Sequence, residues 1–136
     1  MKKKSSSDSR ETALLCVRYA LDKKAYDLLL LDVSEYTSLA DYFLICTGRS
    51  DTQVQAIAQS IDQHLRQVGR KPQRVEGLSS GQWVLIDFGD VVVHVFLESV
   101  RAFYDLERLW ARSPVVTLPE PYRTQARDLR LAMNAR

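Results

Sequence analysis

Apolar and polar residues alternate along the stretch "GQWVLIDFGDVVVHVFLE", on both sides of a central Gly-Asp pair. Two runs of strand-forming residues joined by Gly-Asp predict a β-hairpin with a two-residue turn. In the register that this turn imposes, Trp83 lies opposite Phe96 and Leu85 lies opposite His94. The register therefore decides which side chains share a face of the sheet.

The two faces of this hairpin differ in composition. One face is apolar throughout and is expected to face the core; it carries Val84, Ile86, Phe88, Val91, Val93, Val95 and Leu97. The other face is too polar for a closed core and too apolar for an ordinary surface in water; it carries Trp83, Leu85, Asp87, Val92, His94, Phe96 and Glu98. The mixed face is the candidate functional surface.

Two segments show the spacing of amphipathic helices. Over residues 9 to 22, apolar residues recur on one face, and Asp8 with Glu11 has the spacing of a capping box ahead of them. The stronger pattern lies in "SDTQVQAIAQSIDQHLRQV", where Ser50 and Gln53 form a start box and a following glycine marks the end. The sequence predicts a helix in each segment.

Short apolar runs predict the rest of the sheet. The segments "AYDLLLLDVS", "DYFLICTG" and "QRVEG" have the pattern of strands, and Ser99 is expected to cap a helical segment that Pro114 ends. This order of elements predicts a mixed α/β fold (an α+β mixed sheet) of about five strands, with helices mainly on one face. The other sheet face, with Trp83 and Phe96, is then expected to be open.

The chain divides into three parts by composition. Residues 1–8 are predicted to be a flexible basic N-terminus, residues 9–113 the folded domain, and residues 114–136 a proline-containing basic extension. The three prolines between residues 114 and 121 exclude regular structure there, so that stretch should lie extended over the domain or in solvent. The final segment has only weak helical periodicity.

The formal charge of +2 conceals an uneven distribution. Residues 1–10 and 122–136 each carry four basic and one acidic side chain, whereas residues 11–121 carry 11 basic and 15 acidic ones, a net charge of −4. An acidic core is poorly suited to binding nucleic acid and favours a basic protein partner. The basic ends could still contact RNA peripherally, although short charged termini are more often solvated.

Cysteine usage and hydrophobicity indicate the compartment. Cys16 and Cys46 lie far apart in the sequence with no metal-binding spacing, as expected for reduced thiols in a cytoplasmic protein. No apolar run approaches the ~20 residues of a membrane span, and the first ten residues lack the apolar stretch of a signal peptide.

The sequence offers little for catalysis. "ICTGRSD" leads a strand through a glycine into a helix, as in the Gly-Ser turn that opens the nucleotidyltransferase fold, and could bind phosphate. However, no strand carries two carboxylates one residue apart, and Asp87 and Asp90 are separated by a turn. Neither His64 nor His94 can be matched with a nucleophilic side chain that it would activate as a base. We therefore expect no metal, no cofactor and no enzyme activity.

Four segments together resemble a known family. "DYFLICTG", "RVEG", "WVLIDFGDVVVHVF" and "YDLERLW", in this order, are similar to the ribosomal silencing factor (Iojap) family over about residues 11 to 112. The resemblance implies a nucleotidyltransferase-like fold without the catalytic carboxylates. It also implies a translation repressor that binds ribosomal protein number fourteen of the large subunit, sterically blocks joining of the small subunit, and so lowers translation under nutrient limitation.

The resemblance also implies the residues that face the partner. They are Trp83, Asp87, Phe88 and Tyr104, with Leu109 and Trp110 nearby, and the pattern of the mixed face adds Phe96 and His94. The hairpin register places Phe88 on the core face, so it is either a core residue or reachable around the turn. Two other interpretations remain open: a divergent nucleotide-binding nucleotidyltransferase, and a homodimer formed through the Trp83 face.

Overall fold

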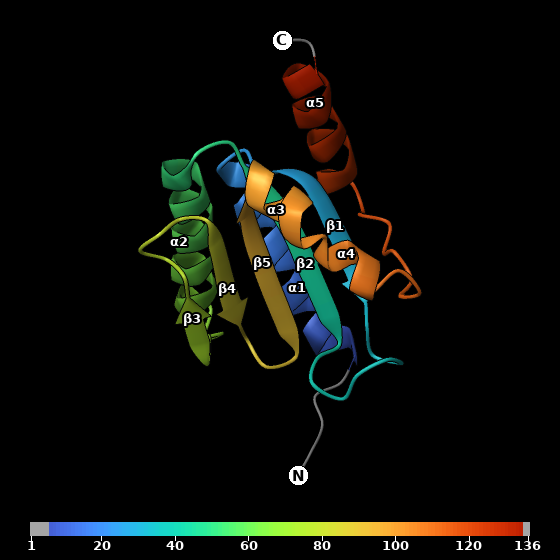
Figure 1. Ribbon diagram of the computed structural model, residues 1–136. Coiled ribbons are helices and arrows are strands. Elements are labelled where there is room, and N and C mark those ends of the chain that lie inside the picture. Colours follow the sequence, from blue (N-terminus) through green and yellow to red (C-terminus); the bar gives the residue numbers. More distant parts are fainter. Residues whose placement is uncertain (1–5, 135–136) are drawn as a thin grey trace.

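A computed structural model of the protein describes residues 6–134 and contains one five-stranded sheet. Its strands are β1 (Tyr26–Asp32), β2 (Tyr42–Gly48), β3 (Arg74–Glu76), β4 (Trp83–Asp87) and β5 (Val91–Leu97). They lie in the order β1-β2-β5-β4-β3, and β2 pairs with β5 in parallel while every other pair is antiparallel (Figure 1). The predicted mixed sheet of five strands is confirmed.

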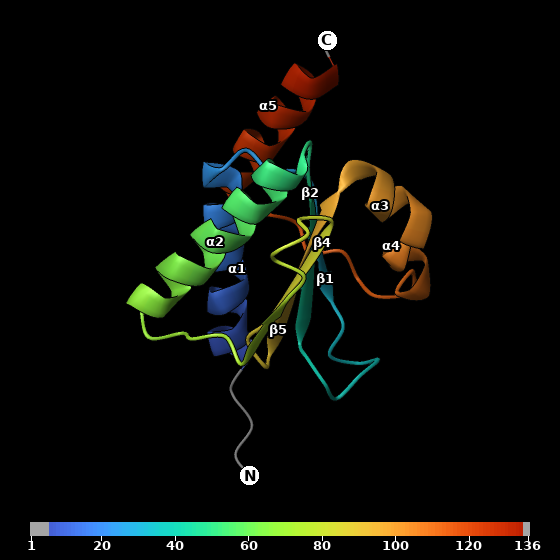
Figure 2. The same ribbon diagram turned by 60° about the vertical axis from the view of Figure 1, so that its left-hand side comes forward.

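The helices lie on both faces of this sheet, the long ones on one side (Figure 2). That side carries α1 (Ser6–Asp22), α2 (Asp51–Gln67) and α5 (Tyr122–Asn134), and the other carries the short helices α3 (Glu98–Tyr104) and α4 (Leu106–Leu109). None of these helices is long and apolar enough to cross a membrane. The expected predominance of helices on one face is confirmed, but α3 and α4 cover part of the opposite face.

The hairpin has the register predicted from its alternation. Trp83 pairs with Phe96 and Leu85 with His94, and Phe88 N donates to Val91 O (2.9 Å) beside the turn. Branched and aromatic side chains from its apolar face pack in the main core between the sheet and the long helices. The predicted core face is therefore correct.

The ends of α2 also follow the sequence signals. Ser50 Oγ accepts a hydrogen bond from Gln53 N (3.1 Å), and Gln53 Oε1 accepts one from Arg49 N (2.6 Å). At the other end, Gly69 has a φ of 80° and the chain reverses there. Capping at the first turn and a left-handed glycine at the end thus fix the length of this helix.

Two predicted helix starts are wrong. Because α1 already begins at Ser6, Asp8 lies inside its first turn and not ahead of it; the Asp8 carboxylate lies 3.3 Å from Arg70, just after α2. Because α3 begins at Glu98, Ser99 lies within the helix, and Leu97 precedes it without a side-chain cap. Residues 6–8 of the proposed flexible N-terminus are therefore helical, and residues 1–5 lie outside the described residues.

The segment after Pro114 runs along the outer edge of β1. Asp32 N donates to Pro114 O (2.9 Å) and Val116 N donates to Leu30 O (2.8 Å), which satisfies groups that an edge strand leaves open. The following helix, α5, then packs Tyr122 and other partly buried residues against the main core. The prolines thus produce an extended strap over the domain, as predicted, and the weak periodicity beyond it forms an ordered helix.

Candidate functional site

The expectation of an open sheet face is wrong, because α3 and α4 fold back over it. They create a second, smaller core whose buried members are Leu31, Val33, Ala40, Ile45 and Phe96. Val100 of α3 and Leu106 of α4 pack against this cluster. A sheet with both faces apolar must bury both, and the chain after β5 supplies the missing cover. Phe96 is fully buried and His94 nearly so, which excludes both as direct contacts for a partner.

A left-handed residue and an arginine set the path of this cover. Asp105 has a φ of 49°, which ends α3 and turns the chain into α4. Arg101 donates to Glu107 Oε2 (3.1 Å), to Asp27 O (2.6 Å) and to Thr47 Oγ1 (2.8 Å). One side chain therefore ties the helical pair to β1 and β2. The sequence pattern gave no signal for this role, since all three acceptors are set by the tertiary fold.

Trp83 connects the buried part of the mixed face to its surface. Its Nε1 donates to His94 Nδ1 (3.1 Å), and its ring packs against Phe96 (4.8 Å between centroids) and Tyr104 (5.0 Å). Burial lowers the pKa of His94 to about 4, so that the imidazole is neutral and able to accept. Trp83 is thus the side-chain hydrogen-bond partner of His94.

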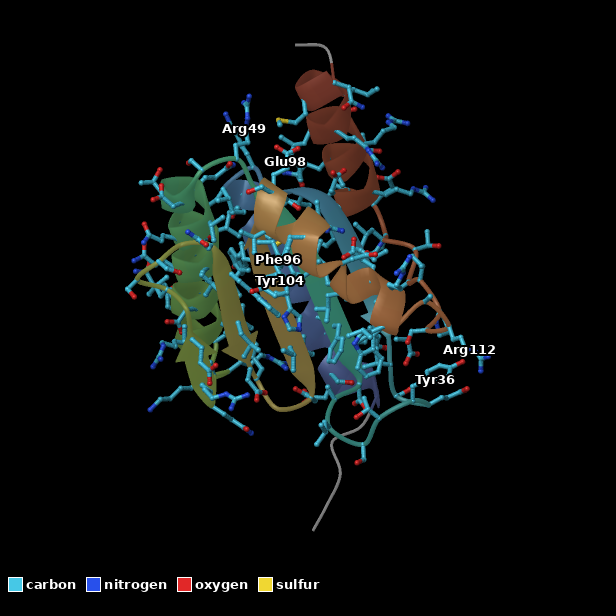
Figure 3. The ribbon with its side chains drawn as sticks, in the orientation of Figure 1. Tyr36, Arg49, Phe96, Glu98, Tyr104 and Arg112 are labelled. Atoms are coloured by element: carbon cyan, nitrogen blue, oxygen red, sulfur yellow. The ribbon has the colours of Figure 1, made fainter. Side chains whose placement is uncertain are left out.

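The surface above this second core exposes large apolar side chains. Tyr104 is 55% exposed, Leu109 is 76% exposed and Phe103 is 79% exposed, whereas Trp83 and Trp110 are partly buried beneath them. Figure 3 shows Tyr104 on α3 over the sheet, close to Phe96. We call Trp83, Phe103, Tyr104, Leu109 and Trp110 the outer strip. Of these, Phe103 was missed by the sequence interpretation, which assumed one continuous helix.

Asp87 and Phe88 lie away from the outer strip. Asp87 points to the same face but stands at the turn end of β4, where Oδ1 accepts from Gly89 N (2.8 Å) and Oδ2 lies 3.7 Å from Arg74. Phe88 is buried in the main core, facing the long helices. The strand alternation that buries Ile86 also buries Phe88. Its proposed role as a partner contact therefore does not fit its position.

The strand-to-helix turn at Gly48 is packed rather than open. A Cβ at this position would lie 2.8 Å from a methyl group of Val54, which accounts for the glycine. The amides at the start of α2 are already occupied: Thr52 N donates to Asp51 Oδ1 (2.8 Å) and Gln53 N to Ser50 Oγ (3.1 Å). Within residues 6–134, no group of three or more His, Cys, Asp or Glu side chains could hold a metal ion. Three of the amides at this turn, those of Arg49, Thr52 and Gln53, are thus already bonded to side chains.

Comparison with known proteins identifies the family. The family described as "Ribosomal silencing factor during starvation" matches residues 6–135 of the chain. The chain belongs to the ribosomal silencing factor family. The ribosomal silencing factor RsfS of Bacillus subtilis is 48% identical over 97 residues, which cover 71% of this chain and 82% of that protein. The resemblance recognised from the four sequence segments is thereby confirmed.

Two further comparisons extend this result. The chloroplastic Iojap protein of Zea mays is 35% identical over 112 residues, covering 79% of this chain and 46% of that protein. A crystal structure of a protein from Chromobacterium violaceum matches with a TM-score of 0.74 and 40% identity, covering 83% of this chain and 97% of the other. Ribosomal silencing factors and this chain therefore share the fold described above.

Proposed function

We propose that this protein represses translation in the cytoplasm by binding the large ribosomal subunit through ribosomal protein number fourteen. Once bound, it sterically blocks joining of the small subunit when nutrients are scarce. It acts by occupying a surface and not by catalysis. The finding that carries the proposal is the outer strip, in a chain that belongs to the ribosomal silencing factor family.

The outer strip has the composition of a protein interface. Exposed aromatic and leucine side chains provide area that loses contact with water when covered, at about 25 cal/mol per Å² before association costs. Exposed acidic side chains of Glu98 and Asp105 flank it on α3 and at the α3–α4 turn. Apolar anchors with negative charge beside them on α3 and at the α3–α4 turn complement a basic ribosomal protein.

The structure also bears on where ribosomal RNA could contact this protein. Arg123, Arg127 and Arg130 stand at positions i, i+4 and i+7 of α5, and all three side chains are more than half exposed. Such spacing places them along one helix face. We include a peripheral contact between this face and RNA phosphates in the proposal, secondary to the protein contact.

Co-sedimentation with large subunits tests the proposed face. Leu109→Ala removes an exposed anchor of the outer strip, whereas Leu131→Ala removes a leucine of comparable exposure on α5. We expect the first to weaken association at least about tenfold and the second to leave it nearly unchanged. Trp83→Ala should also abolish association, but it requires a check of the fold because Trp83 is hydrogen-bonded to His94.

A subunit-joining assay tests the mechanism itself. Added protein should lower the yield of joined ribosomes in proportion to large-subunit occupancy, and Leu109→Ala protein should not. Binding without inhibition of joining would refute steric blocking while leaving the interface intact. Measurement of the mass in solution, with and without large subunits, shows whether a homodimer uses the same strip when the protein is free.

A further inference from the structure

A pocket lies beside the outer strip, where α4 ends. Its volume is about 400 Å³, and it is lined by Tyr36, Arg108, Leu109, Trp110, Ala111, Arg112 and Ser113. Figure 3 shows Tyr36, from the loop between β1 and β2, at the same end of the molecule as Arg112. Two segments far apart in the sequence thus form its walls.

Ser113 carries an unsatisfied hydroxyl behind the wall of this pocket. The residue is only 6% exposed, and its Oγ has no hydrogen-bond partner within the part of the chain that the structure describes. A buried hydroxyl without a partner costs stability. The Oγ atom is itself enclosed, so it lies behind the pocket wall and is not among the groups that a bound ligand would contact.

Two arginines at the pocket add positive charge. The side chain of Arg108 is 85% exposed, and Asp105 lies 3.7 Å from its Nε, too far for a hydrogen bond. Arg112 makes no ion pair or side-chain hydrogen bond with any other residue between 6 and 134. Two guanidinium groups on one side of the pocket are donors that together select an anionic oxygen group.

The remaining surroundings restrict which anion fits. Leu109 and Trp110 give the pocket apolar walls, and Tyr36 is half-exposed opposite them. Glu35 precedes Tyr36 in the sequence, and Asp105 lies 3.7 Å from Arg108; both acids are exposed and offset the charge of the two arginines. A single carboxylate beside an apolar group matches this balance, whereas a chain of phosphates would be repelled by the two acids.

We infer that this pocket binds a segment of a protein partner in which one carboxylate stands beside an apolar side chain. Leu109 and Trp110 belong both to the pocket and to the outer strip. The inference therefore rests on the proposed function, and the segment belongs to the ribosomal protein that covers the strip. The carboxylate pairs with Arg112, and the apolar side chain lies on Leu109 and Tyr36.

A titration without ribosomes tests the pocket directly. The probe is acetyl-Leu-Asp-amide added to the isotope-labelled full chain, with acetyl-Leu-Asn-amide as its neutral counterpart. We expect the aspartate peptide to shift the NMR signals of the Trp110 indole and of the Arg112 and Ser113 amides. The neutral peptide should bind with an affinity at least about tenfold lower. Equal effects of both peptides, or none of either, would overturn the inference. Larger shifts with a short RNA would assign the pocket to nucleic acid instead.

Large-subunit binding then links the pocket to the partner. Arg112→Glu should weaken co-sedimentation at least about tenfold, whereas Lys71→Glu reverses an exposed charge on the loop after α2 and should not. If Leu109→Ala loses binding but Arg112→Glu does not, the pocket inference fails and the proposed function stands. If the unmodified protein does not bind subunits, the proposed function fails, and the peptide titration still decides whether the pocket takes a carboxylate.

Discussion

Trp83 and His94 join β4 to β5 by a side-chain hydrogen bond beneath the outer strip. The indole Nε1 donates to Nδ1 of His94 over 3.1 Å, and Phe96 packs beside the indole. Because Nδ1 accepts, the proton of the neutral ring resides on Nε2. Protonation of Nδ1 would break the bond and place a charge in the second core. The position of Trp83 in the proposed partner-binding surface thus depends on a neutral His94.

This relationship predicts a specific loss of stability in acid. Burial lowers the pKa of His94 from 6.5 to about 4, so the unfolded state binds more protons at pH values between these two. The stabilisation is fully present above about pH 6.5 and is lost as the pH falls to about 4, amounting to at most about 3 kcal/mol. Urea unfolding of the protein at several pH values between about 7.5 and 4.5 measures it.

His94→Gln separates this effect from the titration of carboxylates. Its amide oxygen can accept from Trp83 but does not titrate. We expect the variant to be less stable than the unmodified protein near neutral pH, and to lose less stability on acidification. Parallel losses in both proteins would show that His94 is not the group responsible.

Gly77 fixes the backbone that carries Trp83. It has a φ of 83°, and a Cβ at this position would lie 2.0 Å from the carbonyl oxygen of Trp83. We expect Gly77→Ala to lower the free energy of unfolding by more than about 2 kcal/mol, because backbone strain and a clash with main-chain atoms add. Urea unfolding gives the change, and near-ultraviolet circular dichroism reports the environment of the indole.

Gly69→Ala is the matched control for this substitution. Gly69 has a φ of 80°, but nothing lies within 4 Å of a Cβ placed there. Only the left-handed backbone conformation then destabilises the alanine variant, and the free energy of unfolding should fall by about 1 kcal/mol. If both variants lose the same stability, the close approach to Trp83 makes no contribution.

The parts of the fold that the sequence predicted are those set by local rules. Alternation of side chains fixes the hairpin register, since a shift of one residue would turn Val84 and Ile86 out of the core. The start of α2 is likewise local, because Ser50 caps an amide only three residues away. Each of these features depends on neighbours within one or two turns of chain.

The cover over the mixed face depended on distant residues and was not predicted. Arg101 finds its acceptors in Asp27 and Thr47, 74 and 54 residues earlier in the chain. Asp105 adopts a left-handed conformation that glycine or asparagine would have signalled more clearly. Trp83 lies in the outer strip and stays a predicted contact residue, whereas the expectation that Phe96 and His94 are accessible was wrong.

The C-terminal strap should contribute measurably to stability. Removal of residues 117–136 takes away Leu118, Tyr122 and Leu129, which are partly buried against the main core. We expect the free energy of unfolding to fall by about 3 kcal/mol, from the apolar area returned to water. Urea unfolding of the shortened protein measures the loss, and an unchanged midpoint would mean that α5 is not needed by the domain.

A longer truncation tests the protection of the sheet edge. Removal of residues 114–136 also breaks the hydrogen bonds from Asp32 to Pro114 and from Val116 to Leu30. The exposed edge of β1 is then free to pair with another chain. We expect concentration-dependent association in sedimentation experiments for this variant and not for the shorter truncation. A monomer at all concentrations would show that the strap contributes packing only.

Both cysteines should resist modification in the native protein. Cys16 on α1 and Cys46 on β2 are fully buried, and burial raises the pKa of Cys46 to about 12 and that of Cys16 still higher. The thiolate is the reactive form, so neither should react with a chromogenic disulfide reagent near neutral pH, while both should react in denaturant. Ser38→Cys places a thiol in an exposed loop and serves as the positive control. Rapid reaction of one native thiol would mean that α1 separates from β2 without global unfolding, because the two cysteines belong to the same core.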